Sequence, residues 1–291
     1  MLYTIENEKL RVQIDDRGAQ LWSIQTKDGT EYLWQGDKAY WEDKAPNLFP
    51  YIARLTQGRY TLEGKSYEMT IHGFVNYSLL TVEEQKADSI VFLLVQNEET
   101  RKMYPYDFAY RVAYTLENDR LAVRFSVENR NERPMYFGIG GHPGFRVPLE
   151  KGLDFTDYCL EFDEAKNPVR IDFSPACFLT GEDKPYALAE KNRILLSHDM
   201  FDQDAIVLAG TAKAVTLKSD KSDRAVRVEY PQMDYIGFWH MPHTDAPYIC
   251  IEPWSSLPSR QDVVEDLATQ PGLICLEAGK TYENVWTIQI F

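Results

Sequence analysis

Three short segments of this sequence each place one acid/base side chain among glycine, proline or aromatic residues. They are Ile71 to Phe74 with His72, Gly140 to Phe145 with His142, and Ile249 to Trp254 with Glu252. The sequence around each segment is strand-like, and a rigid β scaffold is well suited to present such groups to a ligand. Two imidazoles and a carboxylate are groups that general acid/base catalysis uses, so the pattern predicts proton transfer.

Two of these side chains stand in unusual local surroundings. His142 lies between a glycine and a proline, so a constrained backbone holds the imidazole while the glycine lets a ligand approach closely. Glu252 follows an apolar run, where a carboxylate is uncommon unless it has partners or a function. We expect Pro253 to break that strand and to leave the carboxylate at its end. A buried, hydrogen-bonded core histidine is the structural alternative for His142.

Other motifs carry weaker signals. His240 and His243 are spaced for metal binding, but Pro242 opposes the helix that would align them, so we interpret them as solvated loop histidines. His198-Asp199 is interpreted as an exposed pair. The glycines around His142 do not follow the GxGxxG spacing, and no helix pattern follows them, which argues against a nucleotide-binding loop.

The elements that must hold these groups are mostly strands. Alternating apolar residues from Phe108 to Val127, with a turn at Asn118-Asp119, predict a long antiparallel hairpin. A second hairpin is expected over Tyr60 to Met69, with its turn at Glu63-Gly64. Further strands are expected at 10–14, 20–26, 89–95, 225–230, 235–239, 248–251 and 281–290.

Helical signal is scarce. We expect a helix only over Gln261 to Thr269 and a helical turn near Lys38 to Glu42, and we interpret Gln85 to Glu99 as a solvated strand face and a turn. Many strands with few helices predict an all-β fold, a large antiparallel β-sandwich. No linker rich in Pro, Gly or Ser interrupts the chain, so we expect one domain over residues 1–291.

Composition excludes several classes of function. The 291 residues carry 45 acidic and 31 basic side chains, a net charge of -14 that repels nucleic acids and anionic membranes. No leader-like or membrane-spanning apolar stretch is evident. The four cysteines, Cys159, Cys177, Cys250 and Cys275, lack CxxC spacing and are interpreted as reduced and structural. We therefore expect a cytoplasmic protein.

Taken in order, five motifs resemble the aldose 1-epimerases, or galactose-mutarotase-like proteins, and especially their LacX-type bacterial branch. The resemblance spans nearly the whole chain, and its carriers are Asn47 to Pro50 leading to Arg54, Ile71 to Phe74, Gly141 to Phe145, Phe201 to Leu208 and Cys250 to Trp254. It implies a β-sandwich fold, a small sugar substrate and a monomer or homodimer.

By the same resemblance, Glu252 matches the general base of the family and His142 its general acid. His72 matches a second active-site histidine, Arg54 an arginine that contacts the sugar, and Asp204 an aspartate that hydrogen-bonds sugar hydroxyls. Trp239 is a candidate for stacking on the apolar face of the sugar ring, as is Trp254, although core packing is the alternative for both. These assignments are expectations that the resemblance implies.

Anomer interconversion needs a base for the C1 hydroxyl and an acid for the ring oxygen, and it requires no metal or organic cofactor. A glutamate with the usual pKa of about 4.3 is ionised at neutral pH, and a histidine near about 6.5 is suited to act as the acid.

Three alternative functions stay open. They are a non-catalytic sugar binder or sensor on the same fold, a hexose-6-phosphate mutarotase using Arg54, Arg59, Lys65 or Arg146, and a glycoside hydrolase using Asp204 with Glu252.

Overall fold

The computed structural model describes residues 1–291, and its longest strands are those that the alternation predicts. β9 (Phe108–Glu117) and β10 (Arg120–Asn129) pair antiparallel over ten residues, and Asn118 takes the positive φ of 56° that their tight turn requires. β5 (Arg59–Leu62) and β6 (Lys65–Glu68) form the second predicted hairpin, with positive φ at Glu63 and Gly64. Both hairpin predictions are confirmed.

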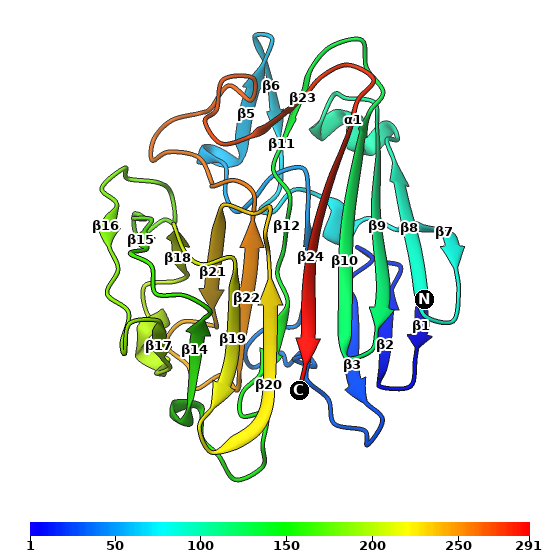
Figure 1. Ribbon diagram of the computed structural model, residues 1–291. Coiled ribbons are helices and arrows are strands. Elements are labelled where there is room, and N and C mark those ends of the chain that lie inside the picture. The colour runs from blue at the N-terminus through cyan, green and yellow to red at the C-terminus, as the bar shows by residue number, and fades with distance from the viewer.

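A nine-stranded antiparallel sheet is built around the β9–β10 hairpin (Figure 1). In spatial order its strands are β17 (Arg193–Leu195), β14 (Tyr158–Phe162), β19 (Ala214–Ser219), β20 (Ser222–Glu229), β24 (Thr281–Ile290), β10, β9, β8 (Ser89–Val95) and β7 (Thr81–Gln85).

An eight-stranded sheet carries the site. In order it contains β16 (Lys184–Pro185), β15 (Val169–Arg170), β18 (Ile206–Ala209), β21 (Tyr235–Trp239), β22 (Tyr248–Trp254), β12 (Gly140–Gly141) and β4 (Asn47–Leu48), and β13 (Gly144–Arg146) also pairs with β22. Smaller sheets are β1 (Leu2–Glu6) with β2 (Leu10–Asp15) and β3 (Leu21–Thr26), and β11 (Met135–Phe137) with β23 (Ile274–Leu276).

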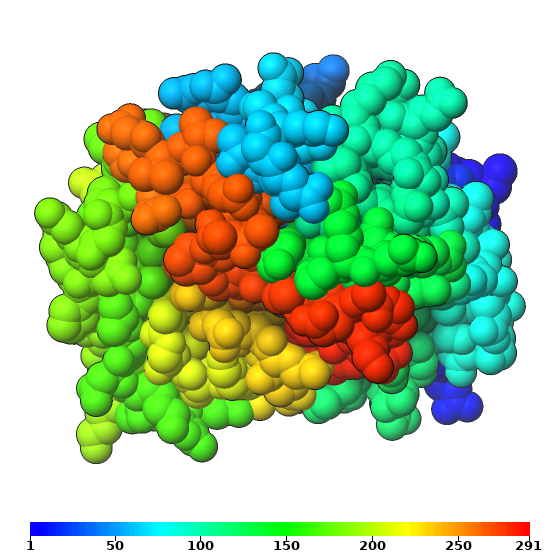
Figure 2. Space-filling model, turned by 90° about the horizontal axis from the view of Figure 1, so that it is seen from above, coloured from blue at the N-terminus to red at the C-terminus, as the bar shows by residue number.

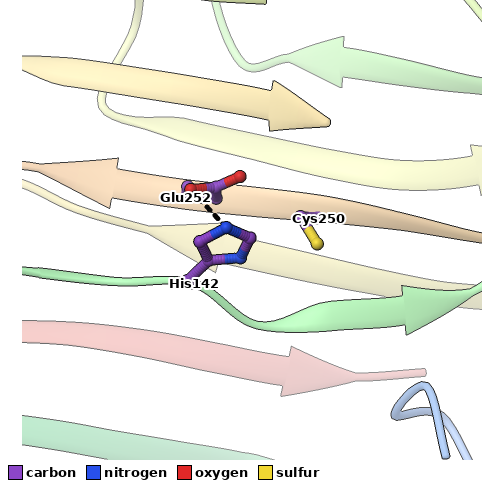
Figure 3. A group of neighbouring side chains, drawn as sticks. All are labelled: His142, Cys250 and Glu252. Atoms are coloured by element: carbon purple, nitrogen blue, oxygen red, sulfur yellow. Dashed lines mark ion pairs between the residues drawn. The ribbon is translucent and has the colours of Figure 1, made fainter. Parts of the chain in front are cut away.

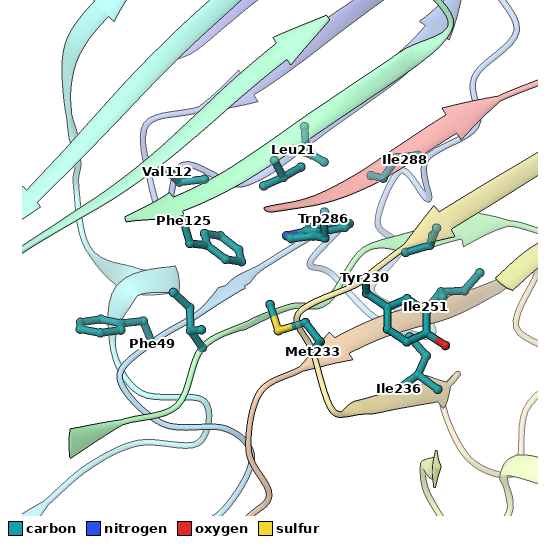
Figure 4. Packing of buried hydrophobic residues seen from close by; sticks show 14 of the residues in the cluster. Leu21, Phe49, Val112, Phe125, Tyr230, Met233, Ile236, Ile251, Trp286 and Ile288 are labelled. Atoms are coloured by element: carbon teal, nitrogen blue, oxygen red, sulfur yellow. The ribbon is translucent and has the colours of Figure 1, made fainter. Parts of the chain in front are cut away.

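One large apolar core joins these sheets. Val112, Phe125 and Ile288 from the nine-stranded sheet pack in the same cluster as Ile251 of the eight-stranded sheet and Leu21 of β3 (Figure 4). Every second residue of the long strands is buried, as expected when a sheet faces a core on one side. The predicted all-β antiparallel sandwich is therefore confirmed.

The short helices differ from the prediction. The only α-helix is α1 (Glu98–Met103), in a stretch that we had assigned partly to a turn, and the Asn97 side chain caps it by accepting from the Thr100 amide. Single 3-10 turns are η1 (Thr56–Gly58), η2 (Val75–Tyr77), η3 (Phe155–Asp157) and η4 (His198–Phe201). No helix has the length and apolar character needed to cross a membrane.

The helix expected over 261–269 does not form. Its backbone instead bonds to another segment, because the Thr61 amide donates to the carbonyl of Glu265 and the Leu267 amide donates to the carbonyl of Thr61, both at 2.8 Å. Figure 2 shows this segment lying beside the β5–β6 hairpin. The stretch around Lys38 is likewise a turn, closed by a bridge between Asp37 and Trp41, and not a helix.

Candidate active site

β22 presents the carboxylate from the middle of a sheet. Ile249 and Ile251 point into the large core. Cys250 and Glu252 alternate with them along the strand and therefore point to the opposite face. The expectation that Pro253 ends this strand is wrong, because β22 continues to Trp254. The continuation buries Glu252, which is only 1% exposed.

The pairing of neighbouring strands brings His142 to this carboxylate. β22 pairs with β12 at Gly140 and Trp254 and with β13 at Gly144 and Cys250, so residue 142 comes opposite residue 252 between the two pairs. His142 Nε2 lies 3.2 Å from Glu252 Oε2 (Figure 3). A Cβ on Gly141 would lie 2.6 Å from the Trp286 ring, so glycine is required beside the histidine.

Burial shapes the electrostatics of this pair. Loss of water raises the pKa of Glu252 well above its usual value, and the negative charge of Asp204 adds to that rise. Loss of water also lowers the pKa of His142 to about 4. The empty site therefore favours neutral side chains, which corrects the expectation of an ionised glutamate beside an imidazolium.

His72 is held by a reciprocal contact with Ala53. The backbone amide of Ala53 donates to His72 Nδ1 at 3.1 Å, and the amide of His72 donates to the Ala53 carbonyl at 2.9 Å. Burial, together with the charges of His142 and Arg54, lowers the pKa of His72. A neutral His72 whose Nδ1 accepts must carry its proton on Nε2, so it offers a hydrogen-bond donor.

Asp204 has a fixed orientation on the opposite wall. Its Oδ1 accepts from the Ala205 amide at 2.8 Å and its Oδ2 accepts from the Cys177 thiol at 3.0 Å. Asp204 and Cys177 both have positive φ, 73° and 63°. Burial and the Asp204 carboxylate raise the pKa of Cys177 to about 11, so the sulfur remains a thiol.

One cavity of about 430 Å³ collects these groups. It is lined by all six residues that the sequence singled out, namely Arg54, His72, His142, Asp204, Trp239 and Glu252. Trp41 and Trp239 form an aromatic wall, with ring centres 5.0 and 5.8 Å from the His142 ring. His142 and Glu252 are in direct contact, so a sugar ring cannot lie between them and must approach both from the cavity side.

The aldose 1-epimerase family model matches residues 1–289 of the chain. This chain belongs to the aldose 1-epimerase family. It is 33% identical to the chromosomal protein LacX of Lactococcus lactis subsp. lactis, and the match covers 96% of this chain and 97% of that protein.

Solved structures agree with this membership of the aldose 1-epimerase family. A galactose mutarotase related enzyme from Lactobacillus acidophilus is 34% identical with a TM-score of 0.96, covering all of this chain and 97% of that one. A galactose mutarotase-like protein from Lactobacillus casei ATCC 334 is 32% identical with a TM-score of 0.95, and both chains are covered completely. The fold is therefore galactose-mutarotase-like.

Sequence reasoning missed several cavity residues of this aldose 1-epimerase family member. Trp41, Asn76 and Cys177 line the cavity, and the Oδ1 atom of Asn76 is buried without a hydrogen-bond partner. Asn76 lies four residues after His72, so its closeness in sequence to that histidine was the one signal that could have indicated a cavity residue. Trp254 was expected only as a stacking or core residue, and its hydrogen bond to the carboxylate was missed: Nε1 donates to Glu252 Oε2 at 3.2 Å. Its i, i+2 spacing from Glu252 would have placed both on one strand face.

Some histidine assignments are corrected. His240 is fully buried against Phe201, and its Nε2 lies 3.1 Å from Nδ1 of His198, so neither the solvated-loop nor the exposed-pair interpretation of these two holds. His243 is exposed, as expected, and its ring lies 3.3 Å from Asp202.

The cations considered for a phosphate group do not gather at the site. Of Arg54, Arg59, Lys65 and Arg146, only Arg54 lines the cavity. Arg59 and Lys65 lie on the exposed β5–β6 hairpin, and Arg146 lines a different depression of the surface. The arrangement therefore lacks the cluster of cations that would bind a phosphate group.

His142, Cys250 and Glu252 place one nitrogen, one sulfur and one oxygen within 4.8 Å of one another (Figure 3). A metal would need Cys250 as a thiolate. The thiol is fully buried beside Trp34 and Tyr248, and burial raises its pKa well above the usual value.

The four cysteines are free, yet they differ in their surroundings. Cys159 and Cys250 are buried, Cys177 is half-buried on the cavity wall, and Cys275 is exposed. Cys275 therefore has no place in the core, because its side of β23 faces solvent.

Proposed function

We propose that this protein is an aldose 1-epimerase that interconverts the α and β anomers of a hexose or related aldose. The observation that carries the proposal is the buried contact of 3.2 Å between His142 Nε2 and Glu252 Oε2 in a cavity that also holds His72, Arg54 and Asp204. The hydroxyl oxygen and the ring oxygen of a sugar hemiacetal are bonded to the same carbon. Adjacent acid and base groups can therefore reach both oxygens from one side.

In the proposed mechanism, Glu252 removes the proton from the C1 hydroxyl while His142 protonates the ring oxygen. The bond between C1 and the ring oxygen breaks, C1 becomes an aldehyde, and rotation about the C1–C2 bond exposes its other face. Reclosure reverses both proton transfers. After ring opening Glu252 is protonated and His142 is neutral, which are the forms that burial favours in the empty site.

The remaining cavity residues orient the sugar in this proposal. Asp204 accepts hydrogen bonds from ring hydroxyls, and Arg54 and the Nε2 proton of His72 donate to sugar oxygens. Trp239 lies against the apolar face of the ring. The hydroxyl-bearing edge and the apolar face of a pyranose thus both have partners. We also propose a cytoplasmic location, because all four cysteines are free thiols.

Purified protein tested on freshly dissolved α-aldoses by polarimetry checks this proposal. We expect faster anomerisation than the buffer blank, and we expect Glu252→Gln and His142→Asn each to lose about 10²- to 10⁴-fold in rate. His198→Asn is the matched control, because His198 is a half-buried imidazole outside the cavity.

Two results would contradict the proposal in different ways. Wild-type speed in both variants would remove the roles of Glu252 and His142. Sugar binding with no acceleration over the blank would favour a non-catalytic sugar binder. Anomer exchange by NMR across free and 6-phosphorylated aldoses would name the sugar class in the same samples.

A further inference from the structure

Two side-chain nitrogens lie close to one oxygen of Glu252, and one of them, the Trp254 indole N–H, donates a hydrogen bond to it. His142 Nε2 and Trp254 Nε1 each lie 3.2 Å from Oε2. The other oxygen, Oε1, accepts no hydrogen bond within the protein, and it is not among the polar atoms that are sealed from solvent without a partner. The residue as a whole is 1% exposed, so its small accessible area lies at the oxygen that faces the cavity.

The position of the Trp254 indole is built into the sheet. Trp254 pairs with Gly140 on β12, while Gly237 on β21 pairs with Glu252. A Cβ on Gly140 would lie 3.1 Å from Cδ1 of the indole, and one on Gly237 would lie 3.5 Å from its Cζ2. The glycine at position 140 therefore leaves space for the ring, whereas a Cβ at position 237 would be in ordinary van der Waals contact with it. The indole is 3% exposed, so no other orientation is open to it without repacking.

We propose that Trp254 is a positioning residue for the reaction, which holds Oε2 of Glu252 and thereby assigns Oε1 as the atom that takes the proton from the C1 hydroxyl. This inference rests on the proposed epimerase function. A carboxylate that can rotate offers either oxygen, whereas one held at Oε2 by the indole N–H, with His142 beside the same oxygen, presents one defined oxygen to the substrate. Such orientation is what makes a buried base effective.

The same contact tunes the acidity of the base. The indole N–H stabilises the ionised carboxylate and opposes the effect of burial on the pKa of Glu252. The titratable groups that face Glu252 are His142 from the segment between β12 and β13, Asp204 before β18, and Cys250 and Tyr248 on β22. Of these groups and Trp254, only Trp254 makes a hydrogen bond to the carboxylate, and His142 lies within ion-pairing distance of it.

Trp254→Phe removes the N–H and keeps an aromatic ring. We expect kcat to fall about 10- to 100-fold, with KM changed by less than about threefold, because a hydrogen bond to a charged group is lost. We also expect the alkaline limb of the pH profile to move up by about one pH unit, since the carboxyl then keeps its proton longer. Trp286→Phe is the matched control, because that buried indole lies near Gly141 and its Nε1 has no partner.

A readout without turnover separates this proposal from the function on which it rests. The carbonyl stretch of protonated Glu252, assigned by its loss in Glu252→Gln, can be titrated by infrared difference spectroscopy in the sugar-free protein. We expect a higher titration midpoint in Trp254→Phe and no change in Trp286→Phe. Replacing Trp254 with benzothienylalanine, which has sulfur in place of N–H, gives the same test at nearly constant volume.

The outcomes are distinct. A lower kcat with an unchanged Glu252 titration and pH profile would mean that Trp254 only fills space, and it would overturn the proposal. Equal titration shifts in the Trp254 and Trp286 variants would also overturn it. Absence of epimerase activity in the wild-type protein would instead remove the proposed function, while the titration would still report whether Trp254 holds the carboxylate.

Discussion

His142 and Glu252 share one proton over the pH range between their two shifted pKa values. The value for His142 is about 4, and the value for Glu252 is raised above its ordinary range, in both cases because of burial. Such a pair titrates as a unit, and the apparent values belong to the pair. The reaction gives one proton to the ring oxygen and takes one from the hydroxyl, so the one-proton form is the active form in the proposed mechanism.

The number of protons bound to the His142–Glu252 pair predicts the pH dependence of kcat/KM. Below the acid limb, expected near the His142 value of about 4, a second proton binds and no base remains. Above the alkaline limb, which lies above the ordinary glutamate range, the pair loses its last proton and no acid remains. The measurement is the catalysed rate from pH 4 to 10 after subtraction of the blank. An acid limb near the ordinary histidine value of about 6.5 would contradict the effect of burial.

At the scale of elements, tight contacts between backbones hold the segments that carry the cavity side chains. Gly73 has a φ of 78° and forms a parallel bridge with Phe49, and an added Cβ there would overlap the Phe49 carbonyl group. His72 directly precedes it with a φ of 63°. The position of one histidine thus depends on a glycine that no larger residue can replace without moving the chain.

Gly73→Ala tests this dependence. We expect a loss of about 2–4 kcal/mol of unfolding free energy, from the strained φ and from overlap with backbone atoms, together with reduced epimerase activity as His72 is displaced. Gly64→Ala is the control, because Gly64 has a similar φ of 76° but open space around it. We expect that control to cost only about 1 kcal/mol. Urea unfolding and polarimetry measure both, and equal losses would contradict the argument.

At the scale of the whole molecule, the sandwich core fixes the sheet that carries the site. Ile251 of β22 packs in the same cluster as Ile288 of β24, while Glu252 lies on the other face of its strand. Burial of apolar side chains between sheets therefore sets the face to which the carboxylate points. Segments from Trp41 to Trp254 meet in one cavity because antiparallel pairing brings distant stretches together.

Two neighbouring residues on β24 measure the contribution of this core. Ile288 is fully buried, and Thr287 lies on the opposite face of the strand with partial exposure. We expect Ile288→Ala to lower the unfolding free energy by about 2–5 kcal/mol through lost burial and a cavity. Thr287→Ala is expected to cost less than about 1 kcal/mol. Guanidinium unfolding compares them, and a similar loss in both would mean that the two faces are not distinguished by burial.

Local patterns in the sequence were enough to predict the strands and the participants of the site. Alternation of apolar and polar residues predicts the β9–β10 hairpin and β24, because burial of one sheet face makes every second residue of a strand apolar. His72, His142 and Glu252 stood out as acid/base groups within strand-like segments, and the resemblance to the family supplied Arg54 and Asp204. All of these line one cavity.

Tertiary structure alone decided the rest. The stretch 261–269 pairs with Thr61 instead of forming a helix, and β22 continues through Pro253, because hydrogen-bond partners from distant segments outweigh local propensity. The direct contact between His142 and Glu252, and the loss of water that moves their pKa values in opposite directions, depend on strand register and on packing around the pair. Strand register and the loss of water around the pair depend on how distant segments pack together in the assembled sheets, so they cannot be predicted from a single sequence.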